Sequence, residues 1–405
     1  MTSRERVRKT LRRSIPDRVP LDIGGTESST IHGIAYRRLR SRLGLRVDPV
    51  RGFDMTQQAA FVDEDVRKLF EADTMLLVLE PRAWRRGELP DGGPCDLPDT
   101  WRPVRDANGD LVVRNAAGVV TARMPKDGFY FEPAFAPLAN VTEPRELDGF
   151  RGAIESFDWP GYADESAADF AARARTMHES TDLAVVANLC MHLLAAGQIL
   201  RGFENFMVDL LAEKTLAHAL LDRLTAAYMK RADDLLDRAG AGKHIDAMLL
   251  TDDLGTQGGP MLSPDTYREM ILPYQRRLFA HLHSKTDAAL CLHSCGSVHA
   301  FIPDLIDAGV DALNPVQVAA EGMDSKRLKR EFGKDITFWG GGCNTQGVLD
   351  RGTPAEVARE VERRVRDFAP GGGFIFTQVH NIQPDVPPEN VLAMVDAFKR
   401  VRDYA

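Results

Sequence analysis

Eight short apolar segments recur along the chain, and stretches with helical periodicity separate most of them. They lie at residues 19–23, 74–79, 183–187, 245–250, 288–292, 311–313, 336–339 and 374–377. Continuous apolar strands joined by helices are typical of a parallel sheet that helices cover. Eight of them predict an α/β fold of the (β/α)₈ TIM-barrel type, with a doubly wound open sheet as the alternative. No internal repeat of fixed period is visible, which argues against a solenoid.

One segment, residues 81–137, departs from this rhythm. Gly, Pro, Asp and Trp dominate it, and Asn108-Gly109 separates two runs that alternate like the strands of a hairpin. We interpret the segment as a small β-rich insertion near the barrel mouth. Because no independent domain boundary is visible, we predict that residues 1–405 form a single domain.

Composition excludes several classes of function. The formal net charge of −8 gives no electrostatic case for nucleic acid as a partner. No apolar stretch reaches the roughly 18 residues that a membrane span needs, and no signal-like segment opens the chain. The five cysteines lack the spacing of a disulfide framework, so we expect a cytoplasmic protein. The basic run at residues 4–13 is interpreted as a solvated helix face.

Polar and titratable residues follow nearly every predicted strand at its carboxyl end. Barrel enzymes place their catalytic groups at this end, so the pattern predicts an enzyme with its site there. We expect six of these residues to bind substrate, namely Glu27, Asn188, Asp252, Asn314, Gln317 and Gln378.

A zinc site is the sharpest prediction within this ring of residues. His293 and Cys295 lie two apart after one strand, and Cys343 follows the second strand after it. Zinc binds Cys and His in tetrahedral geometry, and three protein ligands leave one position for a substrate. A thiol in that position would lose its proton to become a nucleophile. The alternatives are that both cysteines are only buried, or that Cys190 and His192 form a competing pair.

Asp253 and His380 are the candidate catalytic groups. Asp252 and Asp253 end a strand, and one of them is expected to face the site as an acid, a base or a support for His293. The alternative for this pair is capping of a helix. His380 follows the last strand, where an imidazole can transfer protons or anchor substrate. Its alternative is a hydrogen bond to the loop backbone.

Five stretches of the chain resemble the uroporphyrinogen decarboxylase superfamily, including its corrinoid-dependent methyltransferase branch. The resemblance covers nearly the whole chain and itself implies a (β/α)₈ barrel. The stretches are 18–45 (RVPLDIGGTESSTIHGIAYRRLRSRLGL), 252–275 (DDLGTQGGPMLSPDTYREMILPYQ), 293–317 (HSCGSVHAFIPDLIDAGVDALNPVQ), 335–346 (DITFWGGGCNTQ) and 370–392.

The two branches of the superfamily imply different chemistry. Decarboxylases of the superfamily carry an arginine-bearing motif near the first strand, whereas residues 24–29 read GGTESS here, with no arginine. The methyltransferase branch binds zinc on an H-x-C…C motif, which His293, Cys295 and Cys343 match. The resemblance therefore implies zinc-dependent transfer of a methyl group between a methylated substrate or thiol and a corrinoid.

The expected partners follow from the same resemblance. The chain has no DxHxxG corrinoid-binding signature, so the corrinoid (cobalamin) would be free or would come on a separate protein. A small-molecule methyl donor or thiol acceptor completes the reaction, and a homodimer is left open. One alternative function is a metal-independent decarboxylase that uses Asp252, Asp253 or His380. Another is a non-catalytic protein that binds a tetrapyrrole.

Overall fold

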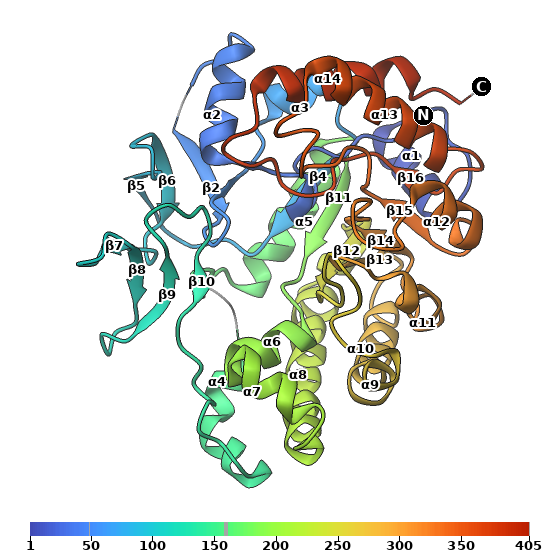
Figure 1. The fold of residues 1–405 in the computed structure, drawn as a ribbon. Helices are drawn as coiled ribbons and strands as arrows, with labels where there is room; N and C mark the ends of the chain where they lie inside the picture. The colour runs from blue at the N-terminus through green and yellow to red at the C-terminus, as the bar shows by residue number, and fades with distance from the viewer. Residues whose placement is uncertain (48, 158–160, 405) are drawn as a thin grey trace.

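A curled parallel sheet forms the centre of the molecule (Figure 1). The computed structural model describes residues 1–47, 49–157 and 161–404. Seven strands pair in the order β16-β15-β14-β13-β12-β11-β4, and every neighbouring pair is parallel. The strands are β4 (Thr74–Val78), β11 (Ala184–Asn188), β12 (Ala247–Thr251), β13 (Ala289–His293), β14 (Ala312–Asn314), β15 (Thr337–Trp339) and β16 (Phe374–Ile375). They coincide closely with seven of the eight predicted strands.

The eighth predicted segment, residues 19–23, lies between the two edge strands of this sheet. Phe376 N donates to Pro20 O at 2.9 Å, and Asp22 N donates to Phe376 O at 2.8 Å. On the other side, Asp73 N, just before β4, donates to Leu21 O at 2.8 Å. The sheet therefore curls until its edges are bridged, as in a TIM barrel. The sequential strand order also contradicts the doubly wound alternative, in which the order reverses part-way.

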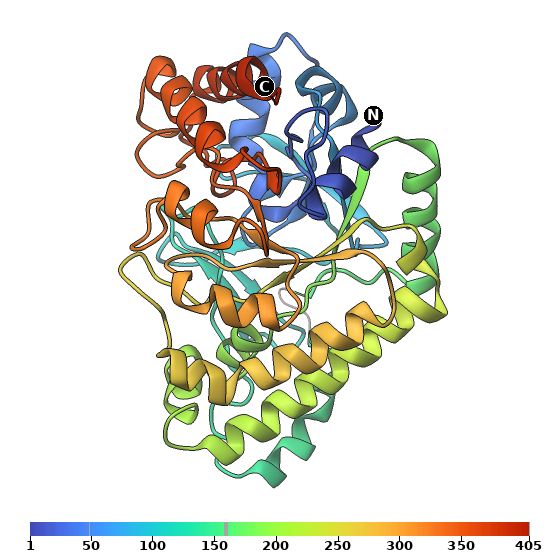
Figure 2. The ribbon, with the colours of Figure 1, turned by 90° about the vertical axis from the view of Figure 1, so that its right-hand side faces the viewer.

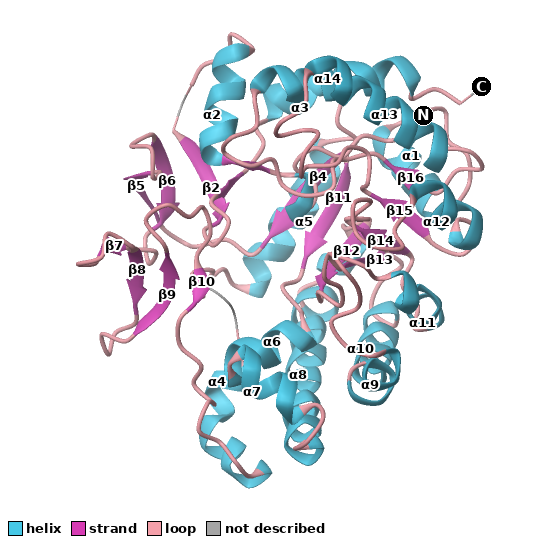
Figure 3. Ribbon diagram, viewed as in Figure 1, coloured by secondary structure: helices cyan, strands magenta, loops and turns pink. Residues whose placement is uncertain are grey.

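The helices lie outside the sheet (Figures 2 and 3). The sequence has helical patterns at 198–213 and at 145–178, the second with a break near residues 159–161. The structure has α6 and α7 over the first range and η2 (Pro144–Phe150), α4 and α5 over the second, while residues 158–160 of that break lie outside the described part. No helix of the described residues is long and apolar enough to cross a membrane. The helices are α2 (Gly33–Arg42), α3 (Glu64–Phe70), α4 (Arg151–Glu155), α5 (Ala167–Ser180), α6 (Leu193–Arg201), α7 (Phe203–Asp209), α8 (Lys214–Ala232), α9 (Pro264–Met270), α10 (Leu272–His283), α11 (Ile302–Asp307), α12 (Ser325–Phe332), α13 (Pro354–Phe368) and α14 (Pro388–Val401).

Two small sheets lie beside the barrel, at the left of Figure 1. The first has the order β1-β3-β2-β6-β5 and the second β10-β9-β8-β7. The predicted hairpin at Asn108-Gly109 is confirmed, because Val104 pairs with Val112 across it. The β-rich part begins before residue 81, since its strands are β1 (Ile31–His32), β2 (Val50–Asp54), β3 (Ala59–Ala60), β5 (Trp84–Glu88), β6 (Pro94–Pro98), β7 (Val104–Arg105), β8 (Leu111–Arg114), β9 (Val120–Met124) and β10 (Glu132–Pro133).

Helix α1 (Ser3–Leu11) closes the amino-terminal end of the barrel. Its Val7 and Leu11 pack into one cluster with the inward-facing side chains of the strands. The barrel interior is thus a packed core, which leaves the carboxyl ends of the strands for a site. The other buried members of the cluster are Ala184, Val186, Ala247, Leu249, Cys291, Ala312, Trp339 and Ile375.

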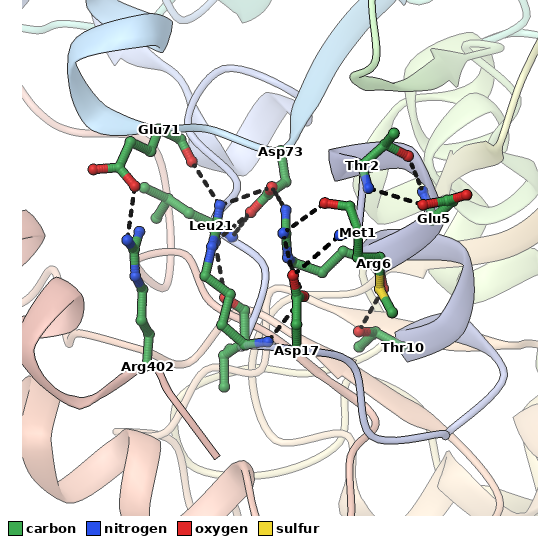
Figure 4. A network of polar contacts seen from close by, with 12 residues as sticks. Met1, Thr2, Glu5, Arg6, Thr10, Asp17, Leu21, Glu71, Asp73 and Arg402 are labelled. Carbon is green, nitrogen blue, oxygen red and sulfur yellow. Dashed lines mark hydrogen bonds and ion pairs between the residues drawn. The ribbon is translucent and has the colours of Figure 1, made fainter.

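Ion pairs of the buried Arg6 side chain hold α1 in place (Figure 4). The Arg6 guanidinium donates to Asp17 at 2.6 Å and to Asp73 at 2.7 Å. Asp73 also accepts from Arg18 at 2.8 Å and from the Leu21 backbone N–H at 2.8 Å. The interpretation of the basic run as a solvated face is therefore wrong for Arg6. Its charge is buried because it joins α1 to the first and second strand segments.

We expect Asp73→Asn to lower the free energy of unfolding by about 3 kcal/mol, because it leaves buried arginine charge without its partner. Urea unfolding followed by circular dichroism measures the change. Glu71→Gln is the matched control, since Glu71 pairs with Lys399 and Arg402 at the surface and such pairs contribute about 1 kcal/mol or less. Equal effects of the two substitutions would contradict this account.

Candidate active site

Three side chains that can bind a metal converge at the carboxyl end of the sheet. They are His293 at the end of β13, Cys295 in the turn after it, and His380 in the loop after β16. Their potential ligand atoms all lie within 4.8 Å of one another. We call these three candidate ligands the metal-binding group. The turn depends on Gly296, whose φ is +82°, because a Cβ atom there would lie 2.3 Å from the backbone of Gly255. A side chain at that position would push Cys295 away from His293.

Hydrogen bonds determine which nitrogen of His293 is free. Its Nδ1 lies 2.7 Å from Asn314 Oδ1, and Asn314 Nδ2 donates to Trp339 O at 3.0 Å. An amide oxygen can only accept, so Nδ1 carries the proton and Nε2 keeps its lone pair. Nε2 lies 3.3 Å from Cys295 Sγ. His293 therefore presents the nitrogen that a metal ion requires.

His380 is arranged in the same way. Its Nδ1 lies 2.5 Å from Asn381 Oδ1, which also accepts from Gln383 Nε2 at 2.8 Å. The rings of His380 and His293 meet edge to face, with centroids 5.7 Å apart. Burial, together with the neighbouring His293, lowers the pKa of His380 to about 4. The imidazole is therefore neutral at neutral pH, which is the form that binds metal.

The donor set fits a zinc ion. Zinc binds nitrogen at about 2.0–2.1 Å and sulfur at about 2.3 Å, which places two tetrahedral ligands about 3.6 Å apart. The 3.3 Å between His293 Nε2 and Cys295 Sγ is close to that value. Burial and the Asp253 carboxylate raise the pKa of the Cys295 thiol, and a cation at this position would favour its thiolate.

The structure does not bring the predicted third ligand, Cys343, into this group in the described residues. This side chain is fully buried and belongs to the main hydrophobic core, with its Sγ 4.0 Å from Asn344 O. The charged groups that affect its pKa are Glu360, Arg364 and Asp350, which belong to α13 or the turn before it. In the described residues, His380 and not Cys343 lies with His293 and Cys295, and metal binding by Cys343 stays a prediction.

Both carboxylate oxygens of Asp252, which was predicted to bind substrate, accept hydrogen bonds within the protein. Oδ1 accepts from the backbone N–H of Leu194 at 2.8 Å, and Oδ2 accepts from Leu193 N and Gln275 Nε2, each at 3.0 Å. These bonds satisfy the first turn of α6, which is the capping alternative. Burial raises the pKa of Asp252 to about 6. The residue thus supports the start of α6, and its contact with substrate stays a prediction.

Asp253, in contrast, lies at the rim of the metal-binding group. Its Oδ1 accepts from the Cys295 backbone N–H at 2.8 Å and lies 3.8 Å from His293 Nε2. Its side chain is about half exposed. It is thus the one carboxylate of the predicted pair that can reach a substrate, and its catalytic role stays a prediction.

Three of the predicted substrate-binding residues are buried supports. Asn314 orients His293 as described above. Gln317 Oε1 accepts from Gly296 N at 2.7 Å and so holds the Cys295 turn. Gln378 is fully buried and donates to Ser28 O at 3.2 Å. Ser28 Oγ in turn donates to Asn314 Oδ1 at 2.9 Å, so these side chains position the metal-binding group from behind.

The other two predicted substrate-binding residues, Glu27 and Asn188, line a cavity of about 210 Å³. The cavity adjoins the metal-binding group, because Thr251 also lines it and pairs with His293 across β12 and β13. Burial and the charge of Asp54 raise the pKa of Glu27 to about 8, while an Asn188 hydrogen bond opposes the shift.

Two further residues of this cavity are the pair that the sequence offered as an alternative metal site. Cys190 and His192 line it and, among the described residues, belong to no group of metal-binding side chains. Cys190 adopts a φ of +50°, an uncommon conformation that often accompanies functional sites. Phe53, Asp54 and Tyr162 complete one wall. The position of Asp54 at the end of a short strand was the only sequence signal for this wall.

Comparison with known proteins places the chain in a family. A family model for uroporphyrinogen decarboxylase (URO-D) matches residues 182–401, which is more than half of the chain. The chain belongs to the URO-D family. The match covers β11 to β16 and all of the metal-binding group, and it confirms the resemblance drawn from the sequence.

Individual URO-D relatives match over a shorter range. The uroporphyrinogen decarboxylase of Legionella pneumophila (strain Corby) is 27% identical over 205 residues, which are 50% of this chain and 53% of that protein. That of Chlorobaculum parvum is 24% identical over 202 residues, or 49% and 53%. The chain thus spans about half the length of these relatives. A methyltransferase from Methanosarcina mazei has the same fold, with a TM-score of 0.61, 18% identity and 99% of each chain covered.

We expect the purified protein to bind about one zinc ion per chain, because three ligands converge there. His293→Ala, Cys295→Ala and His380→Ala should each abolish binding, measured by elemental analysis after dialysis against zinc. Cys343→Ala is the matched control and should retain the metal. Zinc loss in the Cys343 variant, with retention in the His380 variant, would restore the ligand set predicted from the sequence.

A second prediction concerns the role of Asn314 in positioning the His293 ring. Asn314→Leu should weaken zinc affinity roughly 10- to 100-fold, because His293 loses the partner that holds its tautomer and ring orientation. Asn314→Asp keeps the acceptor oxygen and should retain most of the affinity. Competition with a chromophoric zinc chelator measures both. If the two variants bind equally well, Asn314 does not position His293.

Proposed function

We propose that the protein is a zinc-dependent methyltransferase that moves a methyl group between a methylated substrate or thiol and a corrinoid. The observation that carries the proposal is the convergence of His293, Cys295 and His380, with both Nδ1 atoms held by amide oxygens. The name of the Methanosarcina mazei methyltransferase, whose fold this chain shares, also supports the proposal.

The residues of the chain would divide the work as follows. His293, Cys295 and His380 would hold zinc, which lowers the pKa of a bound thiol and so supplies a nucleophile near neutral pH. Asp253, at the solvent-facing rim, would accept the proton that the thiol loses. Glu27 and Asn188 would hold the rest of the small molecule in the adjoining cavity. His380, predicted as an acid or base, acts in this proposal as a ligand.

The corrinoid would meet this site from outside. A cavity of about 210 Å³ is below the usual size of sites for drug-sized ligands and far too small for a corrinoid ring. The corrinoid would carry the methyl group as a free cofactor or on a separate protein at the open end of the barrel. This arrangement agrees with the lack of a corrinoid-binding signature in the chain.

A metal-independent decarboxylase is the second candidate, and the names of the Legionella and Chlorobaculum relatives favour it. A decarboxylase must bind a carboxylate substrate. No Lys or Arg lines the cavity in the described residues, and Glu27 and Asp54 offer such a substrate no positive charge. The cavity therefore fits methyl transfer better than decarboxylation.

A spectroscopic assay separates the two candidates. We expect cob(I)alamin to be methylated by a methylated donor, or methylcobalamin to be demethylated by a thiol, at a rate that falls at least about 100-fold in Cys295→Ala. Removal of zinc with a chelator should have the same effect, and Cys343→Ala should keep the activity. Release of carbon dioxide from an acid, unchanged by chelator and by Cys295→Ala, would contradict the proposal and support the decarboxylase.

A further inference from the structure

The cavity beside the metal-binding group has walls of two kinds. One part is apolar and aromatic, and it includes Phe53, Tyr162, Val78, Leu79 and Ile199. The Tyr162 ring is held in place, because its hydroxyl donates to Phe53 O and Trp101 packs against it edge to face. The faces of such rings carry negative electrostatic potential and attract cations.

The other part of the cavity is acidic. Glu27 and Asp54 both line it, and Asp54 is only 6% exposed. All donors to Asp54 Oδ1 are neutral, namely Thr56 N, Thr56 Oγ1 and Gln57 N at 2.6–3.3 Å. Each carboxylate is close enough to the other for its charge to matter, since Asp54 raises the pKa of Glu27. Two acids close together in one cavity need either a shared proton or a bound cation to offset their mutual repulsion.

No side chain of the described residues meets that need. Neither Glu27 nor Asp54 forms an ion pair in the described part of the chain, and no Lys or Arg lines the cavity there. His192 is the one basic group in the wall, and burial lowers its pKa to about 4, so it is neutral. Arg231 lies behind the wall, where it donates to the carbonyl oxygens of Cys190 and Phe157.

We infer that this cavity binds an organic ammonium cation, and that the methylated substrate or thiol of the proposed transfer carries such a group. Carboxylates together with aromatic rings are the combination that recognises quaternary and methylated ammonium groups. An anionic substrate would meet Glu27, Asp54 and the nearby Asp253 with no compensating base. A neutral substrate would leave Glu27 protonated and would gain no attraction from the two acids. The binding of a cation in this cavity is argued from the cavity itself. The statement that this cation is the substrate rests on the proposed function.

Calorimetry with three molecules of similar shape tests the charge requirement on the full chain. The probes are choline, the uncharged 3,3-dimethyl-1-butanol and the anionic 3,3-dimethylbutanoate. We expect choline to bind at least about tenfold more tightly than the alcohol, and the acid not to bind. Equal binding of choline and the alcohol, or tighter binding of the acid, would overturn the inference.

The pH dependence of choline binding tests whether Glu27 is the carboxylate that pairs with the cation. Glu27 must lose its proton to pair with the cation, so choline affinity should rise roughly tenfold from pH 7 to pH 9 as the pH passes the raised pKa. The groups around Glu27 are Asp54 on β2, Asp253 after β12, and His192, Cys190 and Tyr162 in the wall.

Glu27→Gln removes this titration and should abolish the rise, while weakening choline binding at pH 9. Glu64→Gln makes the same substitution on the surface of α3 and should change neither property. If choline affinity still rises with pH in Glu27→Gln, Glu27 is not the group that pairs with the cation, and the inference is overturned. These measurements need neither zinc nor corrinoid, so loss of choline binding with methyl transfer intact would reject this inference alone. The reverse result would reject only the proposed function.

Discussion

One buried carboxylate, that of Asp22, shapes the loop on which both parts of the site depend. It is fully buried and accepts hydrogen bonds from the Trp339 indole at 2.8 Å and the Thr74 hydroxyl at 2.7 Å, which tie the first strand segment to β15 and β4. It also accepts from Gly25 N and Ser29 Oγ, at 2.8 and 2.9 Å, in the loop that follows. Burial raises the pKa of Asp22, and the bonds offset that cost. The loop is thereby held in one conformation.

That loop serves the two halves of the site at once. Ser28 reaches Asn314, whose oxygen holds the tautomer of His293 in the metal-binding group. The neighbouring Glu27 lines the cavity in which we infer that a cation binds. Two adjacent residues thus link metal binding and substrate binding. A distortion of the loop would therefore affect both, although neither residue is a metal ligand.

The candidate site was predictable from the sequence where it depended on strand order, and not where it depended on side-chain direction. His293 and Cys295 lie where their position after β13 predicted. Cys343, predicted to join them, is not in the group of close ligand atoms that the described residues form, whereas His380 is. His380 was expected as an acid or base, since nothing in one sequence shows that the loop after β16 folds back onto the end of β13.

The sequence alone determined the strand count, the parallel fold and the end of the barrel that carries the chemistry. These follow from hydrophobic periodicity and from the rule that parallel strands align their carboxyl ends. Only the tertiary structure decided which polar residues face the site. Asp252 and Asp253 are adjacent in sequence, yet one caps α6 and the other reaches the rim, because successive side chains at a strand end point to opposite sides. The acidic cavity, too, forms because the fold places Asp54, at the end of β2, and Glu27 in the lining of one pocket.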